Sequence, residues 1–168
     1  MSTSDDLEVA VPGTGESDAG DGSSFRRIFV PVRSPGESAR ALAAATRICS
    51  STINGVLRLV HVRAYEPPVR GCPGRFYFET KAEAAALMDE ALLIIWSGGA
   101  QATTAVVDAP RVQIGMAIAR AASQWPADVI VLTRRRRSAF SRLVLGSVAD
   151  QVMRTASCPV LSVHPDHR

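Results

Sequence analysis

Short apolar runs alternate with longer stretches of helical periodicity from about residue 26 onward. The runs are rich in β-branched residues and nearly continuous in apolar character, which is typical of buried parallel strands. The predicted strands are residues 28–32, 55–62, 102–107, 128–133 and 159–163. Apolar residues between them recur at helical spacing, and the predicted helices begin near Ser34, Thr80, Arg111 and Gly146. This order predicts an α/β fold, an open five-stranded parallel sheet with helices on both faces.

Two of these helices follow a strand directly and carry capping signals. Ser34 is the predicted N-cap of the first helix, and Gly146-Ser147 marks the start of the last. Ligands of parallel sheets bind outside the carboxyl ends of the strands, where the winding direction reverses. The candidate ligand positions are therefore Arg33 and residues 133–137.

Charge divides the chain into two parts. The net charge is +3, but the first 25 residues hold six acidic residues and no Lys or Arg. This segment is rich in Gly and Ser, and it has too few large apolar residues to offset its ordering entropy. We therefore predict a disordered acidic tail over residues 1–25 and one domain over residues 26–168. A solvated leader is the favoured interpretation of the tail, and a segment that folds back over the basic domain is the alternative.

Composition also disfavours several functions. The chain has no apolar run near 18 residues and no signal-peptide pattern at its start, so we expect a cytoplasmic protein without membrane association. Cys49, Cys72 and Cys158 lie far apart, and we expect reduced thiols and no metal site. His61 is interpreted as a packed histidine. Because Ser147 has no nucleophile-elbow motif and no carboxylate pair is evident, we predict no catalytic residues and no enzyme activity.

Three stretches carry a resemblance to a known family. They are the Val-Pro-Val of the first strand, the apolar run at 127–132, and above all residues 145–161. Over about residues 26–164 the chain resembles the universal stress protein family. The resemblance implies an adenine nucleotide alpha hydrolase-like fold with strand order 3-2-1-4-5, and dimerisation, often through the last strand. It also implies ATP binding through a G-x-x-G-x9-G-[ST] loop, with an aspartate after the first strand at the nucleoside.

The sequence departs from this pattern at three positions. Thr133 and Arg136 stand where the first two glycines belong, and Arg33 replaces the aspartate. A side chain at position 136 restricts the space that a triphosphate needs, so we expect that ordinary ATP binding is lost. The resemblance implies the following candidate residues for a nucleotide or anion: Pro31, Val32, Arg33, Thr133, Arg136, Gly146, Ser147 and Val148.

Three interpretations of the arginine-rich loop remain open. In the first, Arg134 to Arg137 and Arg142 form a solvated basic edge or lie over an empty pocket. In the second, Ser147, the helix N-terminus and one or two arginines hold a phosphate-bearing molecule, such as ATP or another nucleotide in an altered pose. Nucleic acid is the least favoured, because no aromatic residue is interleaved with the arginines.

These observations predict a non-catalytic, universal stress protein-like regulatory or binding module of the stress response. No cofactor is certain, and a protein partner is expected without being identifiable. We predict a homodimer through the C-terminal strand, where Val160 and Val163 supply apolar character. The alternative is a sensor that binds a nucleotide or phosphate ligand at the loop from Arg134 to Ser147.

Overall fold

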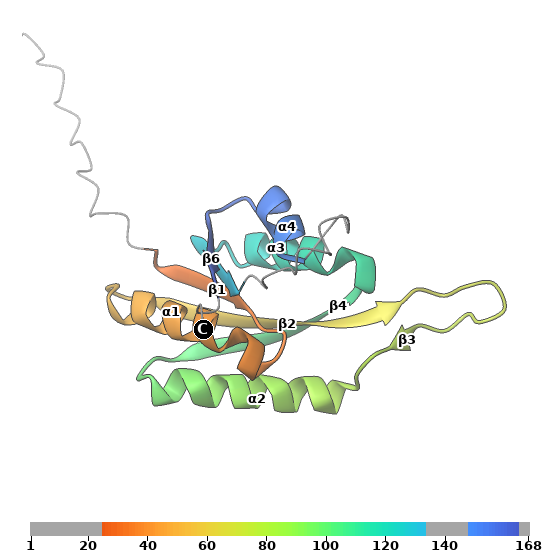
Figure 1. Cartoon of the computed structure of the whole chain (residues 1–168), viewed down its shortest axis with the longest axis horizontal. Coiled ribbons are helices and arrows are strands. Elements are labelled where there is room, and N and C mark those ends of the chain that lie inside the picture. Colours follow the sequence, from red (N-terminus) through yellow and green to blue (C-terminus); the bar gives the residue numbers. More distant parts are fainter. Residues whose placement is uncertain (1–24, 134–147, 165–168) are drawn as a thin grey trace, which may run out of the picture.

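A computed structural model describes residues 25–133 and 148–164 of the chain. In these residues a twisted sheet lies between two layers of helices (Figure 1). The elements are β1 (Arg27–Pro31), α1 (Pro35–Ser50), β2 (Val56–Glu66), β3 (Phe76–Tyr77), α2 (Lys81–Ser97), β4 (Ala102–Pro110), a 3-10 turn η1 (Arg111–Gln113), α3 (Ile114–Gln124), β5 (Val129–Thr133), α4 (Val148–Thr155) and β6 (Val160–Val163). Of the sequence predictions, residues 1–24, the arginines at 134–137 and 142, Gly146 and Ser147 lie outside the described residues.

The predicted parallel order is confirmed. The order β4-β2-β1-β5-β6 corresponds to the expected 3-2-1-4-5, and every pair in it is parallel. Helices α1 and α2 cover one face, while α3 and α4 cover the other (Figure 1). No helix among the described residues is long and apolar enough to cross a membrane.

The prediction of five strands, all parallel, is wrong in one respect. The short strand β3 is a sixth member of the described sheet and pairs antiparallel with the end of β2 through Tyr65↔Tyr77 and Glu66↔Phe76. Strand β2 continues to Glu66, four residues beyond the predicted end. The chain returns through a tight turn in which Gly71 has φ +87°, a conformation that favours glycine. A segment read as a loop is therefore a hairpin.

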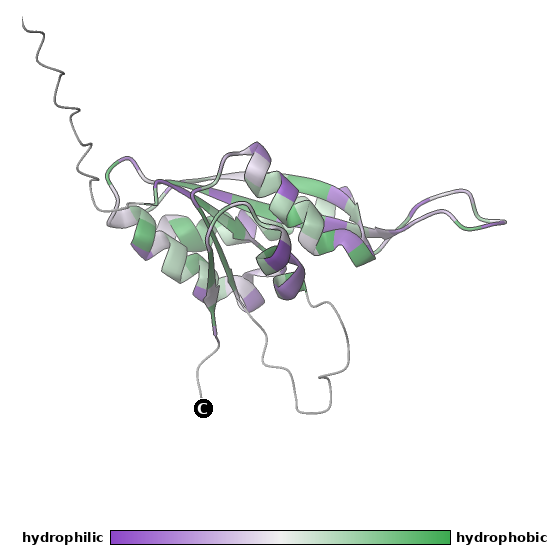
Figure 2. Cartoon of the chain, turned by 90° about the horizontal axis from the view of Figure 1, so that it is seen from above, coloured by the Kyte–Doolittle hydropathy of each residue, from purple (hydrophilic) through white to green (hydrophobic). Residues whose placement is uncertain are grey.

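Successive side chains of β2 alternate between two separate hydrophobic cores, one on each face of the sheet. Leu57 and Leu59 pack under α1 and α2, whereas Val60 and Val62 pack under α3 and α4. The helices carry both apolar and polar residues (Figure 2), and their buried apolar residues, such as Leu42 and Ile95, pack on the sheet. Because successive strand residues point to opposite faces, β1 and β5 are apolar over most of their length, as the sequence predicted, whereas β2 also carries Arg58 and His61.

Beyond Val62 the end of β2, the turn and β3 leave the body of the molecule. We call residues 63–78 the β2–β3 arm, which projects past the helices in Figure 1. Arg63, with only 6% of its surface exposed, donates two hydrogen bonds of 2.8 and 2.7 Å to the Asp108 carboxylate on β4. The Tyr77 hydroxyl donates to the same carboxylate at 3.0 Å. These contacts fix the base of the arm to β4.

Replacing Asp108 with Asn is expected to reduce the acid sensitivity of the fold. The hydrogen bonds from Arg63 are the main cause of a lowered pKa at Asp108. The contact therefore stabilises the fold above the ordinary carboxyl pKa of about 3.9, and this stabilisation is lost as the pH falls through the lowered value. Urea titrations at several acidic pH values should show a shallower loss of unfolding free energy in Asp108→Asn.

The matched control for this experiment is Asp89→Asn, which changes an exposed carboxylate on α2. It should keep the acid dependence of the native chain. Identical acid dependence in Asp108→Asn and the native chain would contradict the role given to the Arg63 contact.

Candidate functional site

The winding of the sheet reverses between β1 and β5. The chain runs outward from β1 through β2 to β4, and then from β5 to β6 on the other side. Strands β1 and β5 are parallel neighbours through Ile28↔Val129 and Phe29↔Ile130, so Val32 and Thr133 lie at the same, carboxyl-terminal end of the two strands. The carboxyl ends of β1 and β5 therefore bring together two of the predicted site positions, at the place where parallel sheets bind ligands.

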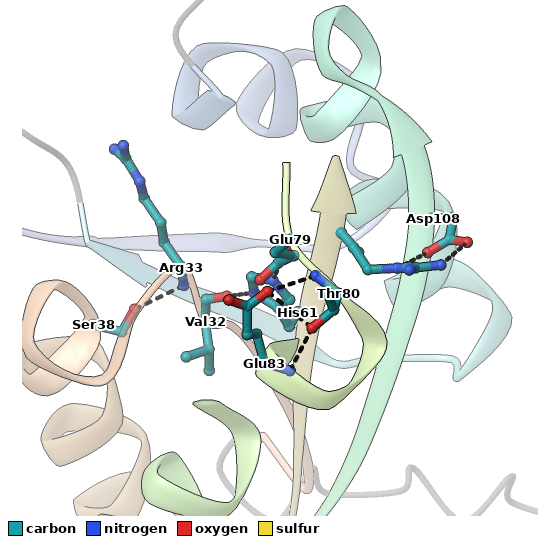
Figure 3. Close-up of polar contacts among 9 residues, drawn as sticks. Val32, Arg33, Ser38, His61, Glu79, Thr80, Glu83 and Asp108 are labelled. Carbon is teal, nitrogen blue, oxygen red and sulfur yellow. Dashed lines mark hydrogen bonds and ion pairs between the residues drawn. The ribbon is translucent and has the colours of Figure 1, made fainter. Parts of the chain in front are cut away.

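The turn that leaves β1 is closed by hydrogen bonds from its own backbone. The Val32 N–H donates to the Val60 carbonyl oxygen at 2.8 Å, so Val32 extends the pairing of β1 past Pro31. The Arg33 N–H donates to the buried Ser38 hydroxyl at 3.1 Å (Figure 3). Ser34 is the N-cap of α1, as predicted, and its hydroxyl accepts from the Glu37 N–H. The main chain is thereby held in one conformation at the candidate site.

The Arg33 side chain lies apart from this network. Its guanidinium group is exposed, pairs with the Glu37 carboxylate at 3.1 Å, and points away from Val32 and His61 (Figure 3). An exposed pair of this kind contributes only about 0–1 kcal/mol, so turning the guanidinium toward an anionic ligand costs little. Arg33 therefore places a positive guanidinium, free to reorient, where the resemblance implies a negative aspartate.

Thr133 ends β5 with an unusual side chain environment. Within the described part of the chain, its hydroxyl oxygen is buried and makes no hydrogen bond, and the same holds for the Ser162 hydroxyl on the neighbouring strand β6. A buried hydroxyl without a partner costs about 1–3 kcal/mol, which a ligand or a water molecule at this position would recover. Thr133 is thus the predicted site residue whose environment most directly indicates a missing partner.

His61 connects the end of β1 to the segment before α2. Its Nδ1 lies 2.8 Å from the Val32 carbonyl oxygen and its Nε2 lies 2.6 Å from Glu79 Oε1 (Figure 3). The carbonyl oxygen and the carboxylate lie on opposite sides of the ring, so both ring nitrogens of His61 are engaged. The interpretation of His61 as a packed residue is confirmed, since only 6% of its surface is exposed.

Sequence reasoning did not find Glu79 as the partner of His61. The signal that could have located it is the capping box that follows. The Thr80 hydroxyl accepts from the Glu83 N–H while the Glu83 carboxylate accepts from the Thr80 N–H, which fixes the start of α2. Glu79 is the residue before the N-cap of α2, and from there its carboxylate contacts His61 on β2.

The start of α4 is positioned by a contact that the sequence did not reveal. Val148 is the first residue of α4, and the Gln151 side chain one turn later reaches α3. Its Oε1 accepts from the Gly115 N–H and its Nε2 donates to the Val112 carbonyl oxygen, both at 3.0 Å. The predicted site residue Val148 therefore lies at a helix start that contacts with α3 hold in position. The predicted site residues Arg136, Gly146 and Ser147 fall outside the described part of the chain.

The fold agrees with a comparison against family models. The model of the universal stress protein family matches residues 24–164. The chain belongs to this family. A comparison with curated protein sequences finds no match.

Solved structures of universal stress proteins share the fold. One, crystallised in complex with cAMP, is 25% identical with a TM-score of 0.61, and the alignment covers 84% of this chain and 98% of that one. A second, from Archaeoglobus fulgidus in complex with dAMP, is 23% identical with a TM-score of 0.60 and coverage of 83% and 98%. A third, from Lactobacillus plantarum, is 19% identical with a TM-score of 0.62 and coverage of 84% and 99%. The match extends over nearly the full length of these family members.

Gly115→Ala is expected to destabilise the protein by displacing the start of α4. A Cβ at this position would lie 2.3 Å from the Gln151 Cβ and 2.8 Å from the Val148 carbonyl oxygen, so the two helices would have to separate. We expect a loss of about 1–3 kcal/mol in the free energy of unfolding, measured by urea titration.

Gly36→Ala is the matched control for Gly115→Ala. A Cβ at position 36 in α1 meets nothing within 4 Å. The higher helix propensity of Ala should leave the stability unchanged or raise it by up to about 1 kcal/mol. An equal effect of the two substitutions would show that close packing of α3 on α4 is not the cause.

Proposed function

We propose that this universal stress protein is a non-catalytic binding module of the stress response that has lost ordinary ATP binding and responds to a nucleotide with a single phosphate group. The observation that carries the proposal is the buried Thr133 hydroxyl, which lies at the end of β5 beside the reversal of the sheet and makes no hydrogen bond to any described residue. A ligand hydroxyl or phosphate oxygen at the strand ends would supply that partner.

The charge at the site favours a small anionic ligand over a triphosphate. Arg33 stands where the family has an aspartate, and its weak surface pair with Glu37 leaves the guanidinium able to reorient toward a phosphate. In the sequence, Gly146-Ser147 keeps a helix start suited to one anion, whereas Thr133 and Arg136 replace the glycines that the backbone needs to approach a chain of phosphates.

The ligands of similar proteins support this choice. The two family members described above were crystallised with cAMP and with dAMP, and each of these ligands contains one phosphate group. The proposed sensor therefore has the fold of these proteins and a ligand site at the strand ends. It differs from the family pattern in the charge of that site, because Arg33 stands in place of an aspartate.

The absence of catalysis is part of the proposal. Among the described residues, His61 is the candidate that we considered for a general base at the site. Both of its ring nitrogens are engaged, one with the Val32 carbonyl oxygen and one with Glu79. It is also nearly buried, so it is not available to take a proton from an attacking water molecule. The cytoplasmic location and the protein partner expected from the sequence stay predictions.

Calorimetric titration of the full chain with AMP, cAMP, dAMP and ATP tests the ligand. We expect binding of one or more monophosphates and weaker binding of ATP. Thr133→Val removes the hydroxyl while keeping the side chain's shape, and it should weaken binding by about three- to tenfold, the effect of one hydrogen bond.

Thr104→Val provides the matched control, because Thr104 is exposed on β4 and away from the strand reversal. It should leave the affinity unchanged. No heat with any nucleotide at millimolar concentration would reject the sensor, and binding of ATP as tight as that of AMP would reject the loss of ordinary ATP binding.

The proposal also includes a homodimer formed through β6. Among the described strands β6 pairs with β5 alone, which leaves its other edge open, and Leu161 on this strand is 42% exposed. Sedimentation at micromolar concentration should show a dimer in the native chain and a monomer in Leu161→Arg, because a charge cannot be buried at an apolar edge. Leu93→Arg, at an exposed position on α2, should remain dimeric, and a native chain that sediments only as a monomer would reject the dimer.

A further inference from the structure

One face of the β2–β3 arm is an internal ladder of arginine and tyrosine side chains. The Arg63 guanidinium lies 4.0 Å from the centre of the Tyr77 ring, the Tyr77 and Tyr65 rings are 5.4 Å apart, and the Arg75 guanidinium lies 4.7 Å from the Tyr65 ring. A hydrogen bond from Arg75 to Tyr77 is the main cause of a raised pKa at Arg75. Stacking of these arginine and tyrosine side chains holds the two strands of the arm together, although no helix covers them.

The other face of the arm presents two exposed phenylalanines. Phe76 and Phe78 have 67% and 52% of their surface exposed, and their rings meet edge to face at 5.7 Å. Because alternate residues of a strand point to opposite faces, both rings lie on the side away from Tyr65 and Tyr77. The Arg111 guanidinium lies 5.5 Å from the Phe78 ring and is itself exposed. An ordered hairpin thus displays two aromatic faces to solvent.

The cations around these rings outnumber the carboxylates. Each nearby carboxylate already has a partner: Asp108 pairs with Arg63, Glu79 with His61 and Glu66 with Arg111. Arg70, Arg75 and Lys81, by contrast, make no ion pair with a described residue. The arm therefore carries positive charge without a carboxylate partner among the described residues at its turn and next to β3, where Arg75 lies on the tyrosine face, and Lys81 adds a charge at the start of α2.

We propose that the β2–β3 arm binds single-stranded nucleic acid, with unpaired bases stacked on Phe76 and Phe78 and phosphate groups near Arg70, Arg75 and Lys81. Base stacking on exposed aromatic rings beside a positively charged surface is the general means by which proteins hold single strands. A duplex hides the faces of its bases, so it would use the cations alone. A second copy of the arm would bring like charges together at a symmetric contact, which disfavours self-association through this face.

The sequence pointed to a different segment for this function. Nucleic acid was the least favoured interpretation of the arginine-rich loop, because no aromatic residue is interleaved there. In the arm, Arg75 directly precedes three aromatic residues, Phe76, Tyr77 and Phe78, and the ladder fixes Arg75 and Tyr77 in space. Binding at the arm is independent of the nucleotide site proposed at the ends of β1 and β5.

Fluorescence anisotropy of the full chain with labelled oligonucleotides tests the proposal. The probes are oligo-U RNA, oligo-dT DNA and a duplex, each of about 20 nucleotides or base pairs, which exceeds the usual site on a small binding surface. We expect the single strands to bind more tightly than the duplex, with affinity that falls as salt rises. The RNA and DNA probes show which sugar the arm accepts, and binding of either one supports the proposal.

Substitutions separate stacking from charge. The double variant Phe76→Ser/Phe78→Ser should weaken single-strand binding by about ten- to a hundredfold, because aromatic stacking of bases is lost. Phe76→Leu/Phe78→Leu keeps the apolar character without the rings and should show a loss of similar size. Arg70→Gln should lower the slope of log affinity against log salt by about 0.7, the contribution of one phosphate contact on a single strand.

Controls identify the outcomes that overturn the proposal. Leu93→Ser, a large apolar residue on α2 that is 60% exposed, should bind as the native chain does. Equal affinity for duplex and single strands, or unchanged binding in both phenylalanine double variants, would assign any binding to charge elsewhere, such as the arginines at 134–137. Poly-glutamate that displaces the strands at equal residue concentration would identify an acidic protein as the partner instead.

Discussion

The parallel pairing of β1 between β2 and β5 is the constraint on which the rest of the structure depends. Its side chains alternate into two cores, with Ile28 and Val30 on one face and Phe29 on the other, and all three are fully buried. Such a strand requires helices on both faces, and helices on both faces require that the winding reverse beside it. The reversal then leaves the ends of β1 and β5 open at one edge, where a ligand can reach backbone groups and short side chains.

At that edge the two neighbouring strand ends differ in how well their polar groups are satisfied. After β1, hydrogen bonds to Val60, Ser38 and His61 engage the backbone groups of the turn. After β5, the Thr133 hydroxyl is buried and bonds to none of the residues that the structure describes. Since unsatisfied buried groups are rare in folded proteins, the contrast locates the incomplete part of the site at β5 rather than β1. Changing Arg33 alters the charge of the edge, whereas changing Thr133 alters its hydrogen bonding.

Local patterns predicted the helices and the parallel strands, because periodicity and capping depend on residues close in the sequence. The features that were missed all join distant residues. Tyr77 pairs with Tyr65 across a Pro- and Gly-rich segment that reads as a loop, Glu79 reaches back to His61, and Gln151 fills the space left by Gly115. Each needs the register of strands or the approach of two helices, which no single stretch of sequence contains. Exposure of the arm phenylalanines could not be predicted for the same reason.

The candidate site at the ends of β1 and β5 is linked to the β2–β3 arm through the two hydrogen bonds of His61. The Val32 carbonyl at the end of β1 bonds His61, His61 bonds Glu79, and Glu79 directly follows Phe78 of the exposed pair. Both bonds are short and nearly buried, so in this low-dielectric setting they resist displacement by water. The backbone after β1, His61 and Glu79 therefore form one hydrogen-bonded unit. By contrast, the Arg33 guanidinium and the exposed rings, which carry the proposed ligand contacts, stand outside that unit and remain free to adjust to what they bind.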